Sequence, residues 1–349
     1  MTRTKPDVPS PDPSLPTPSG LVVVDKPAGW TSHDVVARTR RLAGTRKVGH
    51  AGTLDPMATG VLILGVDRAT RLLTWIVGRD KTYAATIRLG LSTVTDDAEG
   101  EVVDAAPPEA VAAVGDDAVA AGVARLTGDI QQVPAKVSAI KVEGRRAYAQ
   151  VRAGHDVELA ARPVTVSRFA VHRLVRSTDD DGRAVVDVDV TVTCSSGTYV
   201  RALARDLGAD LGVGGHLTAL RRTRVGAWTL EDASTLDELA AEVAAGRPLP
   251  VTSLEEAAAG LFPVRRLTAA ESEDVAHGRR IGPSAADAGE GGAEPVDNDA
   301  VTGGFAPDGR LVALLSDRGH RGERTAKPVL VFLPGERFPG PPGASRGAR

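Results

Sequence analysis

The residues of this chain best suited to chemistry lie in one glycine-rich segment, Gly49–Gly60, which reads GHAGTLDPMATG. The proline after Asp55 biases that aspartate towards extended backbone and stiffens the loop around it. The last glycine opens an apolar run, Val61–Val66, that has the pattern of a buried strand. A carboxylate held on a rigid loop beside a buried strand is suited to act as a nucleophile or a general base.

Two other interpretations of this segment are open from the residues alone. An aspartate in a glycine-rich loop often accepts hydrogen bonds from nearby backbone in an Asx turn, with no chemical role. The segment also resembles a phosphate loop, but it lacks the Gly-Lys-Ser/Thr ending, and no Gly-x-Gly-x-x-Gly pattern follows the first strand. The sequence therefore gives little support to a bound nucleotide cofactor.

The elements that must position this loop alternate between strands, helices and hairpins without a regular strand–helix–strand repeat. The expected strands are Leu21–Val24, Val61–Val66, Tyr83–Leu89, Val164–Val175, Ala184–Cys194 and His216–Val225. Ser32 is expected to cap a helix that stops at Gly44, and further helices are expected at Leu72–Ile76, Pro108–Leu126 and Thr198–Leu211. This order predicts an α+β fold with a mixed, mainly antiparallel sheet flanked by helices.

Composition divides the chain into a large domain, a small domain and less ordered segments. We expect a disordered proline-rich tail at 1–19, a main domain at 20–230, a helical connector at 231–261, a small β-rich domain at 262–335 and a disordered tail at 336–349. The small domain contains expected strands at Leu311–Leu315 and Val329–Phe332, and a flexible loop at 283–304 interrupts it.

Composition also excludes several classes of protein. The 349 residues include one cysteine, Cys194, so neither a disulfide framework nor a cysteine-based zinc site is expected. The chain has no apolar run long enough for a transmembrane helix, and its N-terminus lacks the apolar core of a signal peptide. We therefore expect a cytoplasmic protein with no membrane partner.

The net charge of −3 hides an uneven distribution of charge. Between Leu21 and Lys81, ten basic residues face only five acidic ones, and a second basic run lies at Arg221–Arg224. Residues 231–304 are strongly acidic instead. Such separation favours a face that binds a polyanion such as RNA, although arginine enrichment from genome base composition would give a similar pattern.

An ordered set of motifs in this chain resembles the bacterial tRNA pseudouridine synthase B family, of the actinobacterial type. The motifs are Leu21–Pro27, Thr31-Ser32, Gly49–Gly60, Lys81–Tyr83, Gly90, Thr95–Asp97 with Gly100, Gly128–Pro134, Ser138–Lys141, Ser196–Arg201 and Leu220–Arg222. They cover about 210 residues, from roughly 20 to 230, so the signal is far more specific than any one motif. Residues 262–335 resemble, more loosely, the small PUA-like C-terminal domain of such proteins.

The resemblance implies a role for each matching residue of the main domain. Asp55 takes the place of the family's nucleophilic aspartate, and Arg201 that of the arginine paired with it. Tyr83 matches the tyrosine that stacks on the target base, and Tyr199 matches a neighbouring active-site tyrosine. Leu220 matches an apolar residue that lines the uracil pocket. These assignments imply the pseudouridine synthase fold.

Further residues are expected to contact the RNA outside the uracil pocket. His50 matches a histidine that contacts the T-loop and helps to hold the base out of its stack. The basic side chains of Lys26, Arg221 and Arg222 are expected to bind the RNA backbone. The implied reaction breaks the N1–C1′ bond of a flipped-out uridine and rejoins the uracil through C5. No cofactor or metal is expected for such an isomerisation.

The implied substrate is the T-loop uridine at tRNA position 55, a number that matches Asp55 only by coincidence. We expect a monomer that acts on the tRNA T-stem-loop without a guide RNA. Asp55 could attack C1′, attack C6 of the uracil or remove a proton from C2′, and the sequence does not choose among these routes. The alternatives are a non-catalytic tRNA-binding protein and a related synthase that acts on another RNA or is guided by one.

Overall fold

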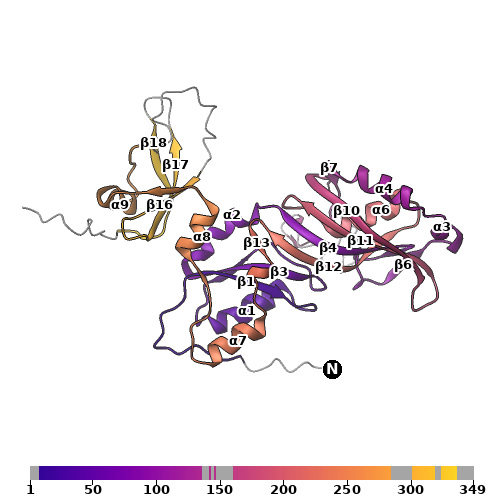
Figure 1. Ribbon diagram of the computed structural model, residues 1–349, viewed down its shortest axis with the longest axis horizontal. Helices are drawn as coiled ribbons and strands as arrows, with labels where there is room; N and C mark the ends of the chain where they lie inside the picture. The colour runs from indigo at the N-terminus through magenta and orange to yellow at the C-terminus, as the bar shows by residue number, and fades with distance from the viewer. Residues whose placement is uncertain are drawn as a thin grey trace, which may run out of the picture.

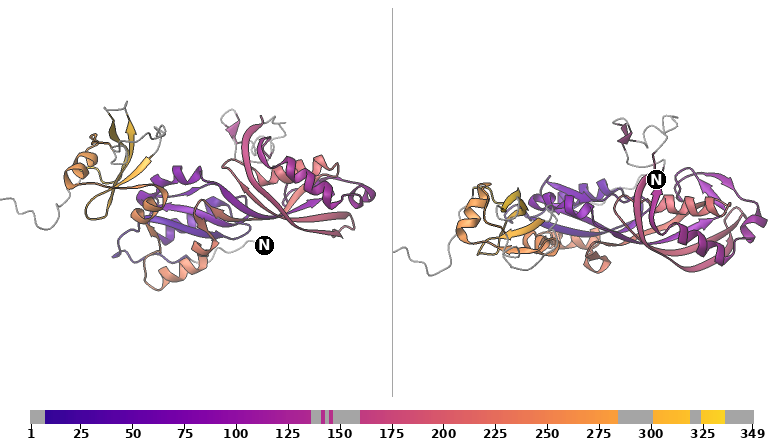
Figure 2. Two further views of the ribbon diagram at one scale, coloured as in Figure 1. Left: turned by 45° about the horizontal axis from the view of Figure 1, so that its top comes forward. Right: turned by 90° about the horizontal axis from the view of Figure 1, so that it is seen from above.

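The computed structural model describes residues 8–135, 141–142, 145–146, 160–283, 301–318 and 324–335. The molecule is elongated, with a long twisted sheet through its main body and a small separate sheet at one end (Figures 1 and 2). No helix within these described ranges combines the length and the apolar character needed to cross a bilayer.

The main sheet joins ten strands of the described chain, in the order β14-β1-β3-β12-β4-β11-β10-β7, with β2 beside β3 and β13 beside β12. Their bounds are β1 Gly20–Lys26, β2 Val48–Ala51, β3 Thr59–Val66, β4 Lys81–Leu89, β7 Gly128–Gln132, β10 Arg162–Thr178, β11 Ala184–Cys194, β12 Gly215–Val225, β13 Trp228–Thr229 and β14 Thr252–Ser253. Strands β3 and β12 are parallel, and the other pairs are antiparallel. The prediction of a mixed, mainly antiparallel sheet is confirmed.

Helices pack on both faces of the sheet at β1 and β3, and on one face at β4. The helices are α1 Ser32–Leu42, α2 Leu73–Val77, α3 Pro108–Ala112, α4 Asp116–Arg125, α6 Val200–Asp210, α7 Leu236–Ala244 and α8 Leu254–Leu261. Two short strand pairs lie outside the main sheet: β5 Leu91–Thr93 with β6 Val102–Ala105, and β8 Lys141–Val142 with β9 Arg145–Arg146. Leu42 of α1, Leu203 of α6 and Leu239 of α7 belong to one apolar core. Ile76 of α2 and Ala258 of α8 belong to a second core.

Two of the expected helices differ from the structure in informative ways. Thr31, rather than Ser32, caps α1: its side chain accepts from the Asp34 backbone, and the Asp34 carboxylate accepts from the backbone of Thr31. Ser32 is thereby left free to bond elsewhere. The segment Pro108–Leu126, expected to be one helix, forms two: α3 ends at Ala112, and α4 begins after its N-cap residue, Gly115.

The two faces of strand β4 differ in burial and polarity. Its residues alternate, so that Lys81, Tyr83 and Ile87 are buried under the helices. The opposite face is polar, and there Arg88 donates to both oxygens of Asp187 at 2.8 and 2.7 Å. The alternation expected from the sequence therefore directs the Tyr83 ring into the covered side.

Gly60 allows the loop after Asp55 to enter the centre of the sheet. Its φ of +100° is rarely adopted by other residues, and a Cβ there would lie 2.2 Å from the carbonyl oxygen of Arg222. This contact arises because β3 runs parallel to β12, with Gly60 opposite Arg222. The glycine thus brings the Asp55 loop and the end of β12 into direct contact.

Within the residues that the structure describes, the C-terminal domain is a four-stranded sheet with one helix. Its strands, in the order β15-β16-β17-β18, are Val264–Arg266, Val301–Phe305, Leu311–Arg318 and Thr325–Val331, and its helix is α9, Ala269–Ala276. The expected small β-rich domain is confirmed. Of the expected loop at 283–304, residues 284–300 lie outside the described chain, and the last four belong to β16.

Segments near α2 attach this domain to the main body. The rings of Trp75 and Phe262 meet edge to face at 5.6 Å. Arg71 donates to the carbonyl of Val331 at 2.6 Å, and Arg79 donates to that of Leu261 at 3.0 Å. Arg71 therefore links the main body directly to β18 of the small domain, and Arg79 holds the end of α8, from which the chain enters that domain.

Candidate active site

The loop that carries Asp55 connects β2 to β3, and side chains from distant parts of the chain hold its backbone. The buried hydroxyl of Ser32 accepts from the Leu54 amide at 2.9 Å and lies 3.1 Å from the Leu54 carbonyl, to which it donates. Arg222, only 1% exposed, donates to the carbonyl of Gly52 at 3.1 Å. With both sides of the loop bonded, Asp55 is presented from a fixed backbone.

Lys26 holds the same loop from its other end. Its ammonium donates to the carbonyls of Pro27, Trp30 and Pro56 at 2.9, 2.7 and 3.1 Å. Burial is the main cause that lowers the pKa of Lys26 to about 8. The side chain is completely buried, so the expectation that it binds an RNA phosphate does not fit its position. Its contacts show a structural role at the Asp55 loop.

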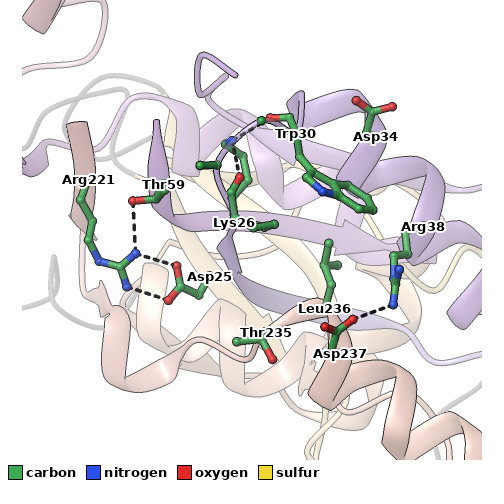
Figure 3. A pocket seen from close by; sticks show the side chains of 13 residues that line it. Asp25, Lys26, Trp30, Asp34, Arg38, Thr59, Arg221, Thr235, Leu236 and Asp237 are labelled. Atoms are coloured by element: carbon green, nitrogen blue, oxygen red, sulfur yellow. Dashed lines mark hydrogen bonds and ion pairs between the residues drawn. The ribbon is translucent and has the colours of Figure 1, made fainter. Parts of the chain in front are cut away.

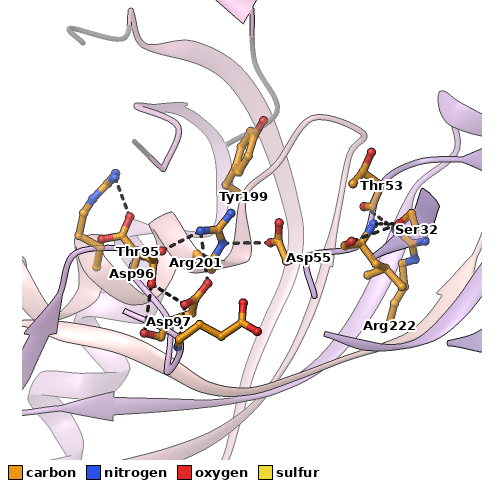
Figure 4. A network of polar contacts seen from close by, with 12 residues as sticks. Ser32, Thr53, Asp55, Thr95, Asp96, Asp97, Tyr199, Arg201 and Arg222 are labelled. Atoms are coloured by element: carbon orange, nitrogen blue, oxygen red, sulfur yellow. Dashed lines mark hydrogen bonds and ion pairs between the residues drawn. The ribbon is translucent and has the colours of Figure 1, made fainter. Parts of the chain in front are cut away.

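Asp55 forms an ion pair with Arg201 of α6, as Figure 4 shows. Nε of Arg201 lies 3.0 Å from Oδ2 of Asp55, and the arginine side chain is 4% exposed against 36% for the aspartate. On its other side, the guanidinium donates to the carbonyl of Thr95 at 2.7 Å and lies 3.3 Å from the carboxylate of Asp97. The guanidinium is therefore held between the Asp55 loop on one side and the 95–97 turn on the other.

Asp97 is the residue of this network that sequence reasoning missed. It was visible only as part of the Thr95–Asp97 motif, with no role attached. In the fold its carboxylate is buried, accepts from Thr95 Oγ1 at 2.5 Å and from the amide of Glu99 at 3.0 Å, and faces Arg201. Two adjacent acids in a polar turn were the signal that could have marked it as a partner for a buried cation.

A small pocket of about 250 Å³ opens beside the Asp55 carboxylate. The structure brings six of the expected site residues together in its lining: Asp55, Tyr83, Tyr199, Arg201, Leu220 and Arg222. The Tyr83 ring is 7% exposed, and burial raises the pKa of its hydroxyl, so the phenol stays neutral near pH 7. The pocket thus combines an open carboxylate with aromatic and apolar walls.

Tyr199 is fixed by its backbone rather than by chance packing. It is the N-cap residue of α6, and its amide donates to the buried side chain of Gln132 at 2.8 Å. The amide nitrogen of Gln132 donates back to the Tyr199 carbonyl at 3.1 Å. The end of β7 therefore sets where α6 begins, and with it the positions of Tyr199 and Arg201.

Comparison with known proteins gives the family of this chain. Residues 40–200 match the family model described as TruB family pseudouridylate synthase (N terminal domain). Residues 201–254 match the tRNA pseudouridylate synthase B C-terminal domain, and residues 262–333 match the C-terminal domain of tRNA pseudouridine synthase II. The tRNA pseudouridine synthase B of Arthrobacter sp. (strain FB24) is 62% identical over 322 residues, which cover 92% of this chain and 99% of that protein.

The chain belongs to the TruB family.

Further relatives and solved structures agree with this assignment. The tRNA pseudouridine synthase B of Thermobifida fusca (strain YX) is 59% identical over 313 residues, covering 90% of this chain and 98% of that protein. The crystal structure of a Cbf5-Nop10-Gar1 complex contains a chain that is 24% identical, with a TM-score of 0.65 and coverage of 97% and 93%. That likeness shows the pseudouridine synthase fold.

His50 does not line the pocket beside Asp55. It lies on β2, where its ring meets that of His33 edge to face at 5.6 Å. Burial, and then the neighbouring His33, lower the pKa of His50, so the imidazole is neutral at physiological pH. An uncharged ring at this place fits contact with a base better than contact with a phosphate.

Arg221 lines a different cavity, one of about 780 Å³ between α1 and the start of α7 (Figure 3). Its guanidinium donates to both oxygens of Asp25 at 3.0 and 2.6 Å and to Thr59 at 3.2 Å. At the other end of the cavity, Arg38 pairs with Asp237 at 2.9 Å. The charge of Arg221 is therefore already matched, which does not fit the expected contact with the RNA backbone.

Arg222 and much of the basic stretch at 21–81 also have internal partners. Besides its contact with Gly52, Arg222 donates to the carbonyl of Val61 at 2.7 Å. Lys81 is 6% exposed and donates to the carbonyls of Val77 and Arg79 at 2.9 and 2.6 Å. The excess of basic residues therefore overstates the charge that the TruB family chain can offer to RNA.

Proposed function

We propose that this chain is a tRNA pseudouridine synthase that isomerises the T-loop uridine to pseudouridine, with Asp55 as the nucleophile. One observation carries the proposal: the Asp55 carboxylate is partly exposed to the pocket and is paired with the buried guanidinium of Arg201. The relatives that are 62% and 59% identical are named tRNA pseudouridine synthase B, which supports the reaction and the substrate class.

The pocket suits a base that has left its stack. Extrusion of a nucleotide costs about a few kcal/mol of unstacking. Stacking of the uracil on the ring of Tyr83 would return roughly 1–3 kcal/mol, and Leu220 supplies an apolar wall of the same pocket. The ribose would then lie near Asp55, because its partly exposed carboxylate lines the same pocket.

Each available route begins at the same carboxylate. Asp55 attacks C1′, attacks C6 or removes a proton from C2′, and in each case the N1–C1′ bond breaks before uracil rejoins the ribose through C5. The proton at C5 leaves, and N1 gains one, so atoms and electrons balance with no added reagent. Since burial keeps Tyr83 neutral, that ring serves to stack rather than to accept the proton.

The substrate is free tRNA, without a guide RNA. The support is the name of the close relatives, which specifies tRNA, together with alignments that cover almost all of their length. We also propose that the chain acts as a monomer in the cytoplasm.

The test is to incubate the purified chain with an unmodified tRNA transcript and to map pseudouridine at single-nucleotide resolution. We expect one new pseudouridine, in the T-loop, with no other RNA added. A transcript with cytidine at that position is the control and should gain none. Absence of product would refute the enzymatic proposal, and product elsewhere, or only after a second RNA is added, would refute the proposed substrate.

A further inference from the structure

We infer, on the basis of the proposed function, that Arg205 is a positioning residue for the reaction: through Asp96 it fixes the turn that orients Arg201 against Asp55. Arg201 and Arg205 are four residues apart on α6 and so lie on the same face of the helix. Both of them reach the same turn, at residues 95–97. Arg205 is not among the residues that line the pocket, so it acts through its neighbours.

The turn at residues 95–97 is the part of the site that holds Arg201 from behind. Nη1 of Arg201 donates to the carbonyl of Thr95 at 2.7 Å and lies 3.3 Å from Oδ2 of Asp97. The direction in which Nε of Arg201 points, towards Asp55, therefore depends on where this turn lies. A shift of the turn would move the guanidinium away from the carboxylate that it must face.

Asp96, at the centre of this turn, has a left-handed backbone conformation and a mostly buried carboxylate. Its φ of +59° is a left-handed conformation that aspartate and asparagine tolerate better than most residues. Its carboxylate is 14% exposed, and burial raises its pKa in spite of the nearby arginines. Arg205 lies 3.4 Å from this carboxylate, and without it a buried acid would lose a charged partner.

The guanidinium of Arg205 also contacts the residue that follows β7. Nη2 donates to the carbonyl of Val133 at 2.8 Å, one residue beyond Gln132, which bonds both backbone groups of Tyr199. One side chain thus links α6, the 95–97 turn and β7. Arg205 also pairs with Asp206, the next residue of α6, at 2.8 Å. This contact is local to the helix and does not contribute to the linkage.

The experiment compares single-turnover rates and tRNA affinity for substituted full-length chains. Arg205→Met removes the contacts with both Asp96 and Val133. We expect the rate of the chemical step to fall about tenfold, with the Kd for tRNA within about twofold of that of the unsubstituted chain. Asp96→Asn keeps a residue that tolerates positive φ but removes the charge, and should lower the rate about threefold or more. The double variant should be no slower than Arg205→Met, because both changes break one linkage.

Arg125→Met is the matched control. Arg125 pairs with Asp210 near the end of α6, so this change also removes an ion pair from that helix, but it leaves the 95–97 turn untouched. We expect its single-turnover rate to equal that of the unsubstituted chain. Equal losses in Arg125→Met and Arg205→Met, a loss confined to Kd, or no loss in Arg205→Met would each overturn the inference.

A second measurement separates this inference from the proposed function. The amide of Leu217 donates to the carbonyl of Asp96 at 3.1 Å, so its hydrogen exchange reports whether the turn stays closed. We expect this amide to exchange faster in Arg205→Met and to be unchanged in Arg125→Met. If the unsubstituted chain makes no pseudouridine, the proposed function fails, whereas unchanged exchange in Arg205→Met refutes the positioning role alone.

Discussion

Two ion pairs, Asp25–Arg221 in the larger cavity and Asp55–Arg201 in the smaller one, differ in how much of the carboxylate the arginine occupies. In the larger cavity, Arg221 bonds both oxygens of Asp25. In the smaller one, Arg201 approaches Oδ2 of Asp55 through Nε, and the aspartate side chain is 36% exposed. The same two residue types therefore give a closed structural pair in one place and an available carboxylate in the other.

The difference lies in which groups surround each arginine. Arg221 of β12 donates through both terminal nitrogens to Asp25 and Thr59, near the end of β1 and the start of β3. Arg201 is buried, and its other donors face Thr95 and Asp97, so only one edge remains for Asp55. A carboxylate that is held at one point keeps lone pairs for chemistry, whereas a bidentate pair uses the full fork of the guanidinium.

The largest expected effect follows from replacing each aspartate in turn. Asp55→Asn should abolish turnover while the Kd for tRNA stays within about tenfold, because the amide is of equal size but is not a nucleophile. Asp25→Asn should lower turnover by no more than about fivefold, since it affects only a structural pair. Product mapping and filter binding on the same preparations measure both. Turnover retained by Asp55→Asn would remove the distinction between the two cavities.

Replacing the arginines should give a smaller contrast of the same sign. Arg201→Met is expected to lower kcat by about 10²–10³-fold, as for loss of one fixed electrostatic partner. Arg221→Met should change kcat by no more than about fivefold. Steady-state assays with saturating tRNA measure both rates. Similar losses in the two variants would mean that the Arg221 cavity also takes part in the reaction.

Lys26 lies between the two cavities and predicts a dependence of stability on pH. Its pKa is about 8 in the folded chain, against an ordinary value of 10.5, so between these pH values the folded state binds fewer protons than the unfolded state. The free energy of unfolding, relative to Lys26→Met, should therefore increase as the pH rises from 8 towards 10.5. Below pH 8 the penalty for the buried charge is fully present. Urea unfolding of both chains at about pH 7 and 9.5 measures the effect, and equal differences at the two pH values would contradict it.

The smallest effect concerns salt. Affinity for tRNA should fall at least about tenfold between roughly 50 and 200 mM salt, because basic side chains that bind phosphates release the counterions condensed on the RNA. Arg221→Met should leave the slope of this dependence unchanged, since Asp25 already neutralises that guanidinium. Arg46, which is exposed, is the comparison, and Arg46→Met should lower the slope by about one if it contacts a phosphate. A slope that falls in Arg221→Met would show that RNA displaces Asp25.

Most of the sheet could be predicted from the sequence because strand patterns are local. The alternation in β4 and the apolar run in β3 both depend on neighbouring residues, and the structure confirms them. The helix cap was displaced by one residue, from Ser32 to Thr31, because two adjacent hydroxyl residues are equally suitable caps by type. Only the fold shows that Ser32 instead bonds the backbone of Leu54.

The sequence by itself determined the stiff glycine–proline loop around Asp55, the order of the strands that carry the motifs and the family to which those motifs belong. Tertiary structure alone decided which charged side chains are open: it buried Lys26 and Arg222 against carbonyls, closed Arg221 with Asp25 and placed Asp97 behind Arg201. Backbone preferences follow from adjacent residues, so they are written locally. The partner of a charge is set by distances between segments that are remote in the chain, and no local pattern records it.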